Sequence, residues 1–283
     1  MKFAVTGGKG GTGKSTVAIN LAWLLSKKNK VVLVDADVEC PNDHILLSLE
    51  LKNKKTAYIF RPRFNYKTCI KCGLCRDNCS EHAIVMFKEG YPFLMPTLCS
   101  GCKTCQLVCP VNAIESDRKI IGHTFVTQLN ENLTLVTGML KEGEERSYPL
   151  VLETKRRAEE IDADIKIYDT SAGTGNHVAA AIDGTDFAIV VTEPTPLGIH
   201  DLRMIMNLLN KQKKKGYVVV NRYDLVENFD ENGLDIIGRI PLSDELLKSY
   251  ISGKPVVETF PESDASKEFN RIYNKVMEIW QKL

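Results

Sequence analysis

The sequence predicts an α/β fold: a mostly parallel sheet with helices on both faces, interrupted by one small inserted domain. Short apolar runs rich in β-branched residues alternate with helical patterns along most of the chain, as is typical of parallel strands buried on both faces. Between residues 62 and 118 this alternation stops, and Cys, Gly, Pro and Lys become frequent. We therefore expect a large domain formed by 1–61 and 119–283, with 62–118 inserted into it.

The elements of the large domain follow from their patterns in order. Residues 1–6 are apolar enough for a short buried strand, and a helix is expected to begin near Lys14 because apolar residues then recur every three or four positions. Further apolar runs predict strands at 31–34, 133–136, 165–168, 187–191, 217–220 and 236–240. Helical patterns between them include 149–161 and 198–209.

Composition excludes several classes of protein. In 283 residues, 43% are hydrophobic and 26% are charged, which is typical of a globular protein. A net charge of +1 gives no reason to expect a nucleic-acid partner. No apolar stretch reaches the about 20 residues that span a bilayer, and the chain starts on a core strand instead of a signal peptide. We expect a cytoplasmic protein.

A terminal amphipathic helix is predicted near residues 269–283, where apolar residues recur at helical spacing. Its few cations are offset by Glu268 and Glu278, so the basic face of a membrane-binding helix is weak. We expect this helix to pack against the sheet, and membrane contact is not expected.

A phosphate-binding loop lies between the first strand and the first helix. Glycines let backbone N–H groups approach phosphate oxygens, and the helix N-terminus favours an anion. Lys14 is suited to reach the terminal phosphates, and the Ser15 hydroxyl to hold Mg²⁺. We expect ATP or ADP with Mg²⁺ to bind through Gly8, Lys9, Gly10, Gly11, Thr12, Gly13, Lys14, Ser15 and Thr16.

The position of Lys9, directly before two glycines, resembles the deviant Walker A motif of the MinD, ParA, Mrp and nitrogenase-iron-protein ATPases. Asp35-Ala36-Asp37 resembles the first switch of that family, and the segment 169–173 resembles the second. The resemblance covers nearly all of 1–60 and 119–283. It implies a P-loop NTPase sheet and ATP hydrolysis in a homodimer that forms with ATP.

The same resemblance assigns roles to single residues. Lys9 would reach the partner's nucleotide across the dimer interface, Asp37 would orient the attacking water, and Asp169 would lie near Mg²⁺. Asn221 and Arg222, after the strand 217–220, match the place where the family recognises adenine, with Pro241 as a further contact. The alternative for the two aspartates is a helix cap or turn, and for the adenine residues a plain turn.

Eight of the nine cysteines form two runs of the pattern C-x2-C-x2-C-x3-C. The second run repeats the first at +30, as do Ala83 and Ala113, and Ile84 and Ile114, which predicts two copies of one small unit. Clustered cysteines in a chain without a signal peptide favour metal ligands over disulfides. Four thiolates complete the coordination of a [4Fe–4S] cluster. Zinc is the main rival, but a closely spaced triplet suits a cube better than a tetrahedral zinc pair.

The insert resembles a bacterial-type ferredoxin, a small α+β domain with two [4Fe–4S] clusters, in which the fourth cysteine of each run ligates the other cluster. This implies one cluster on Cys69, Cys72, Cys75 and Cys109, and a second on Cys79, Cys99, Cys102 and Cys105. The whole chain is similar to MinD-superfamily ATPases that carry such an insert. Cys40 lies outside both runs; a small buried side chain is favoured there, and a ligand at the dimer interface is the alternative.

Two functions are compatible with these features. In the first, nucleotide-dependent dimerisation gates electron transfer through the two clusters to an unidentified redox partner or metalloprotein. In the second, the protein is an ATP-dependent carrier or scaffold for iron–sulfur or metal-centre assembly, or for organising a partner complex. Two complete sets of ligands favour the first, because permanently bound clusters suit electrons better than cargo.

Overall fold

The computed structural model describes residues 1–226 and 233–283. The chain forms two compact units, and each is described here by itself. The large unit consists of 1–55, 123–140 and 147–283, and the small unit of 56–122 and 141–146. The segment 62–118, expected as an insert, lies inside the small unit, which also includes the short stretch 141–146.

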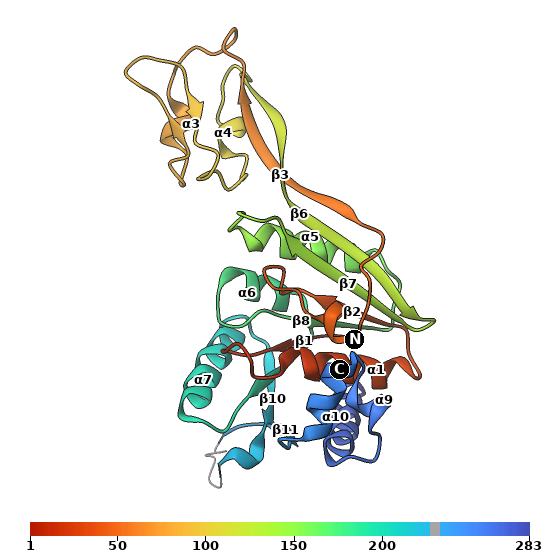
Figure 1. Cartoon of the computed structure of the whole chain (residues 1–283). Coiled ribbons are helices and arrows are strands. Elements are labelled where there is room, and N and C mark those ends of the chain that lie inside the picture. The colour runs from red at the N-terminus through yellow and green to blue at the C-terminus, as the bar shows by residue number, and fades with distance from the viewer. Residues whose placement is uncertain (227–232) are drawn as a thin grey trace. The chain divides into compact units, whose positions relative to one another are not determined.

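The described residues contain a nine-stranded sheet in the order β11-β10-β9-β1-β8-β2-β7-β6-β3. Every pair from β11 to β7 in this order is parallel, which confirms the mostly parallel α/β fold (Figure 1). The strands are β1 (Lys2–Thr6), β2 (Val31–Asp35), β3 (Lys55–Phe64), β6 (Ile114–Asn130), β7 (Leu133–Leu140), β8 (Ile165–Asp169), β9 (Phe187–Thr192), β10 (Lys215–Asn221) and β11 (Ile236–Ile240).

The edge strand β3 and its neighbour β6 are absent from the sequence prediction. Only Glu131 and Asn132 separate β6 from β7, and so short a connection between paired strands makes an antiparallel hairpin. Both missed strands mix exposed charged residues with scattered apolar ones, so neither contains the continuous apolar run that identified the central strands.

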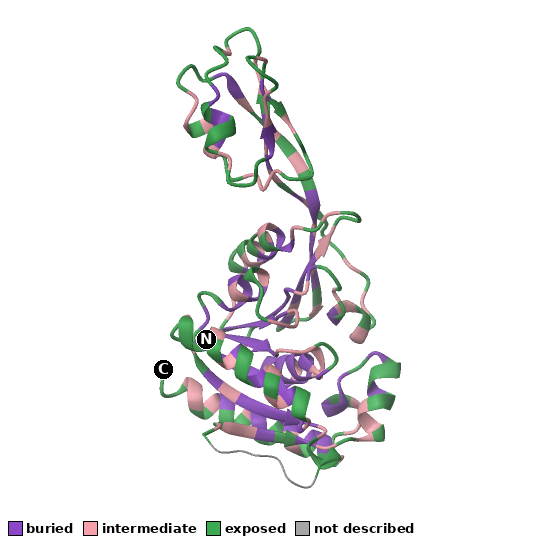
Figure 2. Cartoon of the chain, turned by 90° about the vertical axis from the view of Figure 1, so that its left-hand side faces the viewer, coloured by how far each residue is buried: buried purple, intermediate pink, exposed green. Residues whose placement is uncertain are grey.

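Helices cover both faces of the central strands because successive side chains of a strand point to opposite faces. In β1, Phe3 and Val5 join a core with α1, α9 and α10, whereas Ala4 joins a second core with α5, α6 and α7 (Figure 1). Figure 2 shows the central strands buried along most of their length. The helices of this unit are α1 (Lys14–Ser26), α2 (Asp43–Leu46), α5 (Ser147–Glu159), α6 (Asn176–Ile182), α7 (Pro196–Lys211), α8 (Asp244–Ser252), α9 (Val256–Thr259) and α10 (Asp264–Trp280), with a 3₁₀ turn η1 (Tyr223–Leu225).

The terminal helix α10 packs as expected. Phe269, Ile272 and Val276 are fully buried in the same core as α1, and a Cβ on Gly238 of β11 would meet Ile272 at 2.3 Å. The apolar stripe of this helix therefore faces the sheet. Within the described residues, no helix is long and apolar enough to cross a bilayer.

The small unit has the internal repeat that the sequence predicts. Its helices α3 (Leu74–Asp77) and α4 (Thr104–Leu107) are 30 residues apart, like the cysteine runs, and β4 (Ile84–Val85) pairs with β5 (Phe93–Leu94) in an antiparallel sheet. Before each helix stands a residue with positive φ, 81° at Gly73 and 67° at Lys103. Its core is small and includes two of the cysteines: Phe60, Cys75, Ile84, Cys105 and Ile114.

Candidate functional site

The sequence-predicted nucleotide residues meet where parallel strands end. β1 leads into the glycine loop and α1, and its neighbour β8 ends at Asp169, which lies in register with Val5 of β1 and with Asp35 of β2. Ligands of open parallel sheets bind outside the carboxyl ends of the strands. The fold therefore brings the loop and both switch-like segments to one place.

The glycine loop is shaped by backbone that requires glycine. Gly11 and Gly13 have φ of 79° and 93°, in the left-handed region where side chains are strained. A Cβ on Gly13 would lie 2.4 Å from the amide nitrogen of Asn221, whereas Cβ atoms on Gly10 and Gly11 would meet nothing within 4 Å. The loop is packed on one side and open on the other.

Lys14 begins α1 and is nearly buried, with 8% of its surface exposed. Its ammonium donates to the backbone carbonyl of Lys9 across 3.2 Å. Burial lowers the pKa of Lys14, and the charges of Asp169 and Asp37 act against this lowering. This lysine is thus held inside the curve of the loop, where a phosphate group would supply the anion that favours its charged form.

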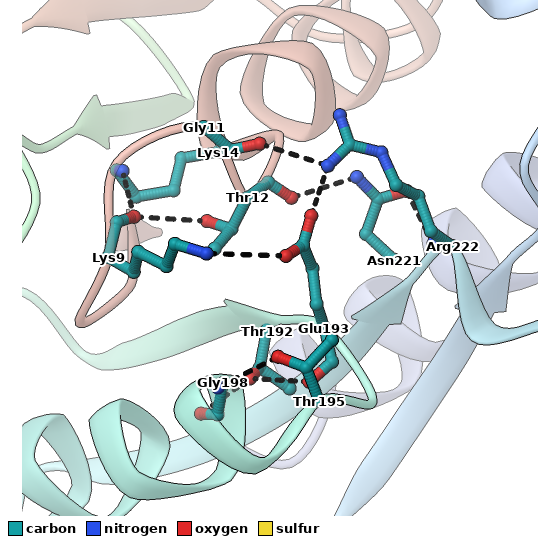
Figure 3. A network of polar contacts seen from close by, with 10 residues as sticks. All are labelled: Lys9, Gly11, Thr12, Lys14, Thr192, Glu193, Thr195, Gly198, Asn221 and Arg222. Atoms are coloured by element: carbon teal, nitrogen blue, oxygen red, sulfur yellow. Dashed lines mark hydrogen bonds and ion pairs between the residues drawn. The ribbon is translucent and has the colours of Figure 1, made fainter. Parts of the chain in front are cut away.

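Asn221 and Arg222 close the other side of the loop (Figure 3). Asn221 Nδ2 donates to the carbonyl of Thr12 across 2.8 Å, and an Arg222 Nη1 donates to the carbonyl of Gly11 across 3.2 Å. Pro241 follows β11, whose last residue Ile240 lies in register with Asn221. These residues support the phosphate loop through its backbone, and their contact with adenine stays a prediction.

Glu193 is a site residue that the sequence analysis missed. It directly follows the apolar strand β9 and is 7% exposed. One carboxylate oxygen accepts from Arg222, and the other lies 3.9 Å from the ammonium of Lys9 (Figure 3). An acidic residue directly after a mostly apolar strand was the available signal. Glu193 thus places the side chains of Lys9 and Arg222 on the same carboxylate.

A group of buried carboxylates lies beside Ser15. The Ser15 hydroxyl donates to Asp169 Oδ2, and the backbone N–H of Asp43, at the start of α2, donates to Asp35 Oδ2 across 3.1 Å. Asp35 and Asp43 are fully buried, Asp169 is 1% exposed, and Asp37 is half-buried. The sequence analysis gave no role to Asp35 or Asp43, although three aspartates within nine positions after a buried strand were visible.

Buried carboxylates with few donors are costly to ionise. Both side-chain oxygens of Asp43 and Asp169 Oδ1 are buried without a hydrogen-bond partner. Burial raises the pKa of Asp169 to about 6, and the charge of Asp37 adds to this, against the lowering effects of the Ser15 hydrogen bond and the Lys14 charge. The negative charge here is therefore unbalanced in the protein alone, which suits a site for a divalent cation.

We predict a pH dependence of stability that originates in Asp169. Because its pKa in the folded protein lies above its ordinary value of 3.8, the folded state retains the proton where the unfolded state has lost it. The free energy of unfolding should therefore fall as the pH rises from about 4 to about 6. Urea unfolding without Mg²⁺ and nucleotide, compared between wild type and Asp169→Asn, measures this contribution. Parallel stability–pH curves for the two proteins would contradict it.

In the small unit, the last cysteine of the second run lies with the first three cysteines of the first run. Cys69, Cys72, Cys75 and Cys109 line one cavity. Backbone pairing explains the crossing: Asn65, before the first run, donates its N–H to Ala113, after the second, and Met95 donates to Ala83 in the same way. The charge of Cys79 in turn acts on Cys99, and Cys99 and Cys102 act on Cys105.

Burial disfavours the charged thiolate form of Cys75, Cys99 and Cys105. Burial, with the charges of Cys99, Cys102 and Cys75, raises the pKa of Cys105 to about 11. Such thiols stay protonated in the metal-free protein, and metal ions reverse this preference. The last thiol of each run accepts a backbone N–H: Cys79 from Ala83 at 3.3 Å and Cys109 from Ala113 at 3.2 Å.

The donor set can be compared with what a single ion and a cluster each require. Over the described parts of the chain, no group of three or more His, Cys, Asp or Glu side chains is arranged to hold one metal ion. Zinc requires four ligands about 2.3 Å from a single point. In a [4Fe–4S] cube each thiolate binds its own iron, so the four sulfurs surround a larger space. The four cysteines around one cavity fit that arrangement.

Cys40 does not match its expectation. It was expected to be a small buried side chain, but it is exposed. It follows the first-switch segment, in a turn where its backbone N–H donates to Asp37 across 3.1 Å. Cys40 belongs to neither core of the large unit.

A strand, a glycine loop with a buried lysine, a helix and carboxylates at neighbouring strand ends define a P-loop nucleotide-binding protein. The family model described as "CobQ/CobB/MinD/ParA nucleotide binding domain" (CbiA) matches residues 3–256. The chain belongs to this family of ATP-binding NTPases.

Relatives agree with the assignment. The chain is 32% identical over 266 residues to the "uncharacterized protein MJ0579" of Methanocaldococcus jannaschii, covering 90% of each chain. It is 25% identical to an "iron-sulfur cluster carrier protein" of Pyrococcus abyssi, covering 98% of this chain and 85% of that one. The structure of the septum site-determining protein MinD with Mg-ADP from Pyrococcus horikoshii has the same fold, with a TM-score of 0.62, 21% identity and coverage of 97% and 95%.

Proposed function

We propose that this chain is an ATP-hydrolysing iron–sulfur protein in which nucleotide-dependent dimerisation gates electron transfer through two [4Fe–4S] clusters to a partner protein. The observation that carries the proposal is the cavity that Cys109 of the second run shares with Cys69, Cys72 and Cys75 of the first, in a chain of a nucleotide-binding family. When bound, such clusters accept and release single electrons. The first would be held by Cys69, Cys72, Cys75 and Cys109, and the second by Cys79, Cys99, Cys102 and Cys105.

The nucleotide would be bound and hydrolysed by residues of the large unit. The backbone from Gly8 to Thr16 would surround the phosphates of ATP, and Lys14 would balance their charge. Ser15 and Asp169 would hold Mg²⁺ between them, which supplies the charge that the buried carboxylates lack. Asp37, half-buried at the end of the first switch, would orient the attacking water.

Lys9 provides a test of dimerisation. Its side chain is 41% exposed and its partner Glu193 is 3.9 Å away, so an exchange of this weak contact for a nucleotide on a second copy would cost little. We expect Lys9→Ala to retain ATP binding through Lys14 but to lose ATP-dependent dimerisation and hydrolysis. Sedimentation with and without ATP measures the first loss, and phosphate release the second.

The control for this prediction is Lys28→Ala. This exposed lysine follows α1, away from the loop, and its removal changes the net charge equally. Lys28→Ala should dimerise with ATP like the wild type. A Lys9→Ala protein that dimerises normally would contradict a role of Lys9 across the interface.

The second candidate function is an ATP-dependent carrier or scaffold for iron–sulfur assembly. It is favoured by the relative named as an iron–sulfur cluster carrier, and by the exposure of Cys40 beside the first switch. A carried cluster has to be released, whereas Cys75 and Cys105 are buried in the core of the small unit. Ligands that also form a core suit a permanent cluster, which favours electron transfer.

The proposal is tested by redox titration followed by electron paramagnetic resonance. If nucleotide and electron are coupled by a typical 1–3 kcal/mol, a one-electron midpoint should shift by roughly 40–130 mV. Titrations with ADP, with a non-hydrolysable ATP analogue and without nucleotide should then differ. Equal midpoints, together with reduction of the native partner that is independent of nucleotide, would leave the carrier function as the better account.

A further inference from the structure

The first switch is hydrogen-bonded to the last residue of a neighbouring strand. β2 and β7 run parallel with Asp35 in register with Thr137. Just beyond this pair, the backbone N–H of Leu140 donates to the carbonyl of Val38 across 2.8 Å. Val38 is the residue after Asp37, so this hydrogen bond links the end of the first switch to Leu140. Both residues belong to the large unit.

After Leu140 the chain passes into the small unit, where 141–146 is firmly attached. Lys141 donates its N–H to Ile121 across 2.9 Å. The side chain of Glu144 is 4% exposed, and its oxygens lie 2.6 Å from Lys119 Nζ and 2.6 Å from Arg146 Nε. Burial alone would raise the pKa of Glu144, but the hydrogen bonds from Arg146 and Lys119 lower it to about 2. The carboxylate is ionised and holds Arg146 in one orientation.

Arg146 is in turn hydrogen-bonded to the second cysteine set. Its Nη1 donates to the backbone carbonyl of Cys99, and its charge acts on the Cys99 thiol. Across the described residues, no hydrogen bond joins 141–146 to a cysteine of the first set. Among the described residues, Cys99 of the second set is therefore the cysteine that a hydrogen bond joins to the segment 141–146.

We propose that Glu144 and Arg146 couple the nucleotide site to the second cysteine set, so that the cluster on Cys79, Cys99, Cys102 and Cys105 is the one that responds to nucleotide. This inference rests on the proposed function, since it assumes that the set holds a cluster. Arg146 is a positioning residue: it places a cation and a hydrogen bond next to Cys99. Hydrogen bonds and charge near the ligands set the potential of a cluster.

The positive charge of Arg146 should change the midpoint potential of the cluster in one definite direction. A cation close to a site favours the added electron of the reduced state, so Arg146→Ala should lower the midpoint potential of one of the two reduction waves and leave the other unchanged. A tenfold change in the reduction equilibrium is about 59 mV for one electron, and we expect a shift of this order. The same variant should abolish the nucleotide dependence of that wave.

A second measurement does not depend on redox activity. Amide hydrogen exchange of the wild type should differ between ADP and a non-hydrolysable ATP analogue in peptides covering 99–105 and 141–146, but not in 69–75. Arg146→Ala should lose the difference at 99–105 and keep normal ATP affinity and iron content. Arg146→Lys retains the charge without the paired hydrogen bonds. Its midpoint potential should therefore return close to that of the wild type, whereas its response to nucleotide should be restored less completely.

Arg61→Ala is the matched control. Arg61 is an arginine of the same unit that pairs with Asp117, and no hydrogen bond joins it to a described cysteine. This variant should behave as the wild type in both measurements.

The possible outcomes separate the inference from the proposed function. A nucleotide-dependent wave that persists in Arg146→Ala would overturn the inference and leave the proposed function intact. Exchange at 99–105 that follows nucleotide only when Arg146 is present, with electron transfer indifferent to nucleotide, would support the inference and reject the proposed function. No nucleotide effect on either measurement in the wild type would overturn the inference.

Discussion

Replacing Lys14 with alanine is expected to abolish useful ATP binding. The ammonium lies inside the glycine loop, 8% exposed and in the field of Asp169 and Asp37. Without it, the phosphates of ATP would lose the buried lysine of the loop and would have Mg²⁺ alone to offset these carboxylates. Loss of one partner of a buried charge pair costs about 2–5 kcal/mol. We expect the dissociation constant for ATP with Mg²⁺, measured by calorimetry, to increase by a factor between about 30 and several thousand.

The control must separate this effect from the loss of any buried lysine. Lys166 serves well because it is 6% exposed, lies at the beginning of β8 and pairs with Glu159. The phosphate loop follows the other ends of these parallel strands. Lys166→Ala should reduce stability while binding ATP normally. Equal affinity of Lys14→Ala and the wild type would reject the assignment of this loop as the nucleotide site.

Protein purified without oxygen is expected to contain about eight irons and eight acid-labile sulfides per chain, since each complete set of four cysteines holds about four of each. Replacing Cys72 should remove one cluster and leave about four irons. It should also loosen the small unit, because its apolar core consists of few residues and two of them are cysteines. Small domains of this kind depend on their metal for stability.

Metal analysis and limited proteolysis together measure both effects. Cys72→Ala should show new cleavage between residues 62 and 118 but not in the large unit, whose two cores contain no cysteine. Cys40→Ala is the matched control, since Cys40 is exposed and belongs to neither set; it should retain all of the iron. Stoichiometric zinc in place of iron would reject the cluster assignment.

The sequence by itself determined features whose residues are neighbours in the chain. The glycine loop from Gly8 to Ser15 could be recognised because strand, turn and helix follow one another without a break. The repeat of the cysteine runs was equally plain, because a spacing of 30 residues is a property of the sequence. The central strands were predicted because burial on both faces demands apolar residues at every position. The edge strand β3 and its neighbour β6, both partly exposed to water, have no such requirement.

The tertiary structure alone decided which distant residues meet. Glu193 joins Lys9 and Arg222 because β9 and β10 end beside the loop, and Arg146 reaches Cys99 although 47 positions separate them. Asp43 lies with Asp35 and Asp169 because a turn carries the chain back over the strand ends. Such contacts leave no periodic pattern in the chain. They form where strand order and packing bring the segments together, so a sequence shows the side chains but not their partners.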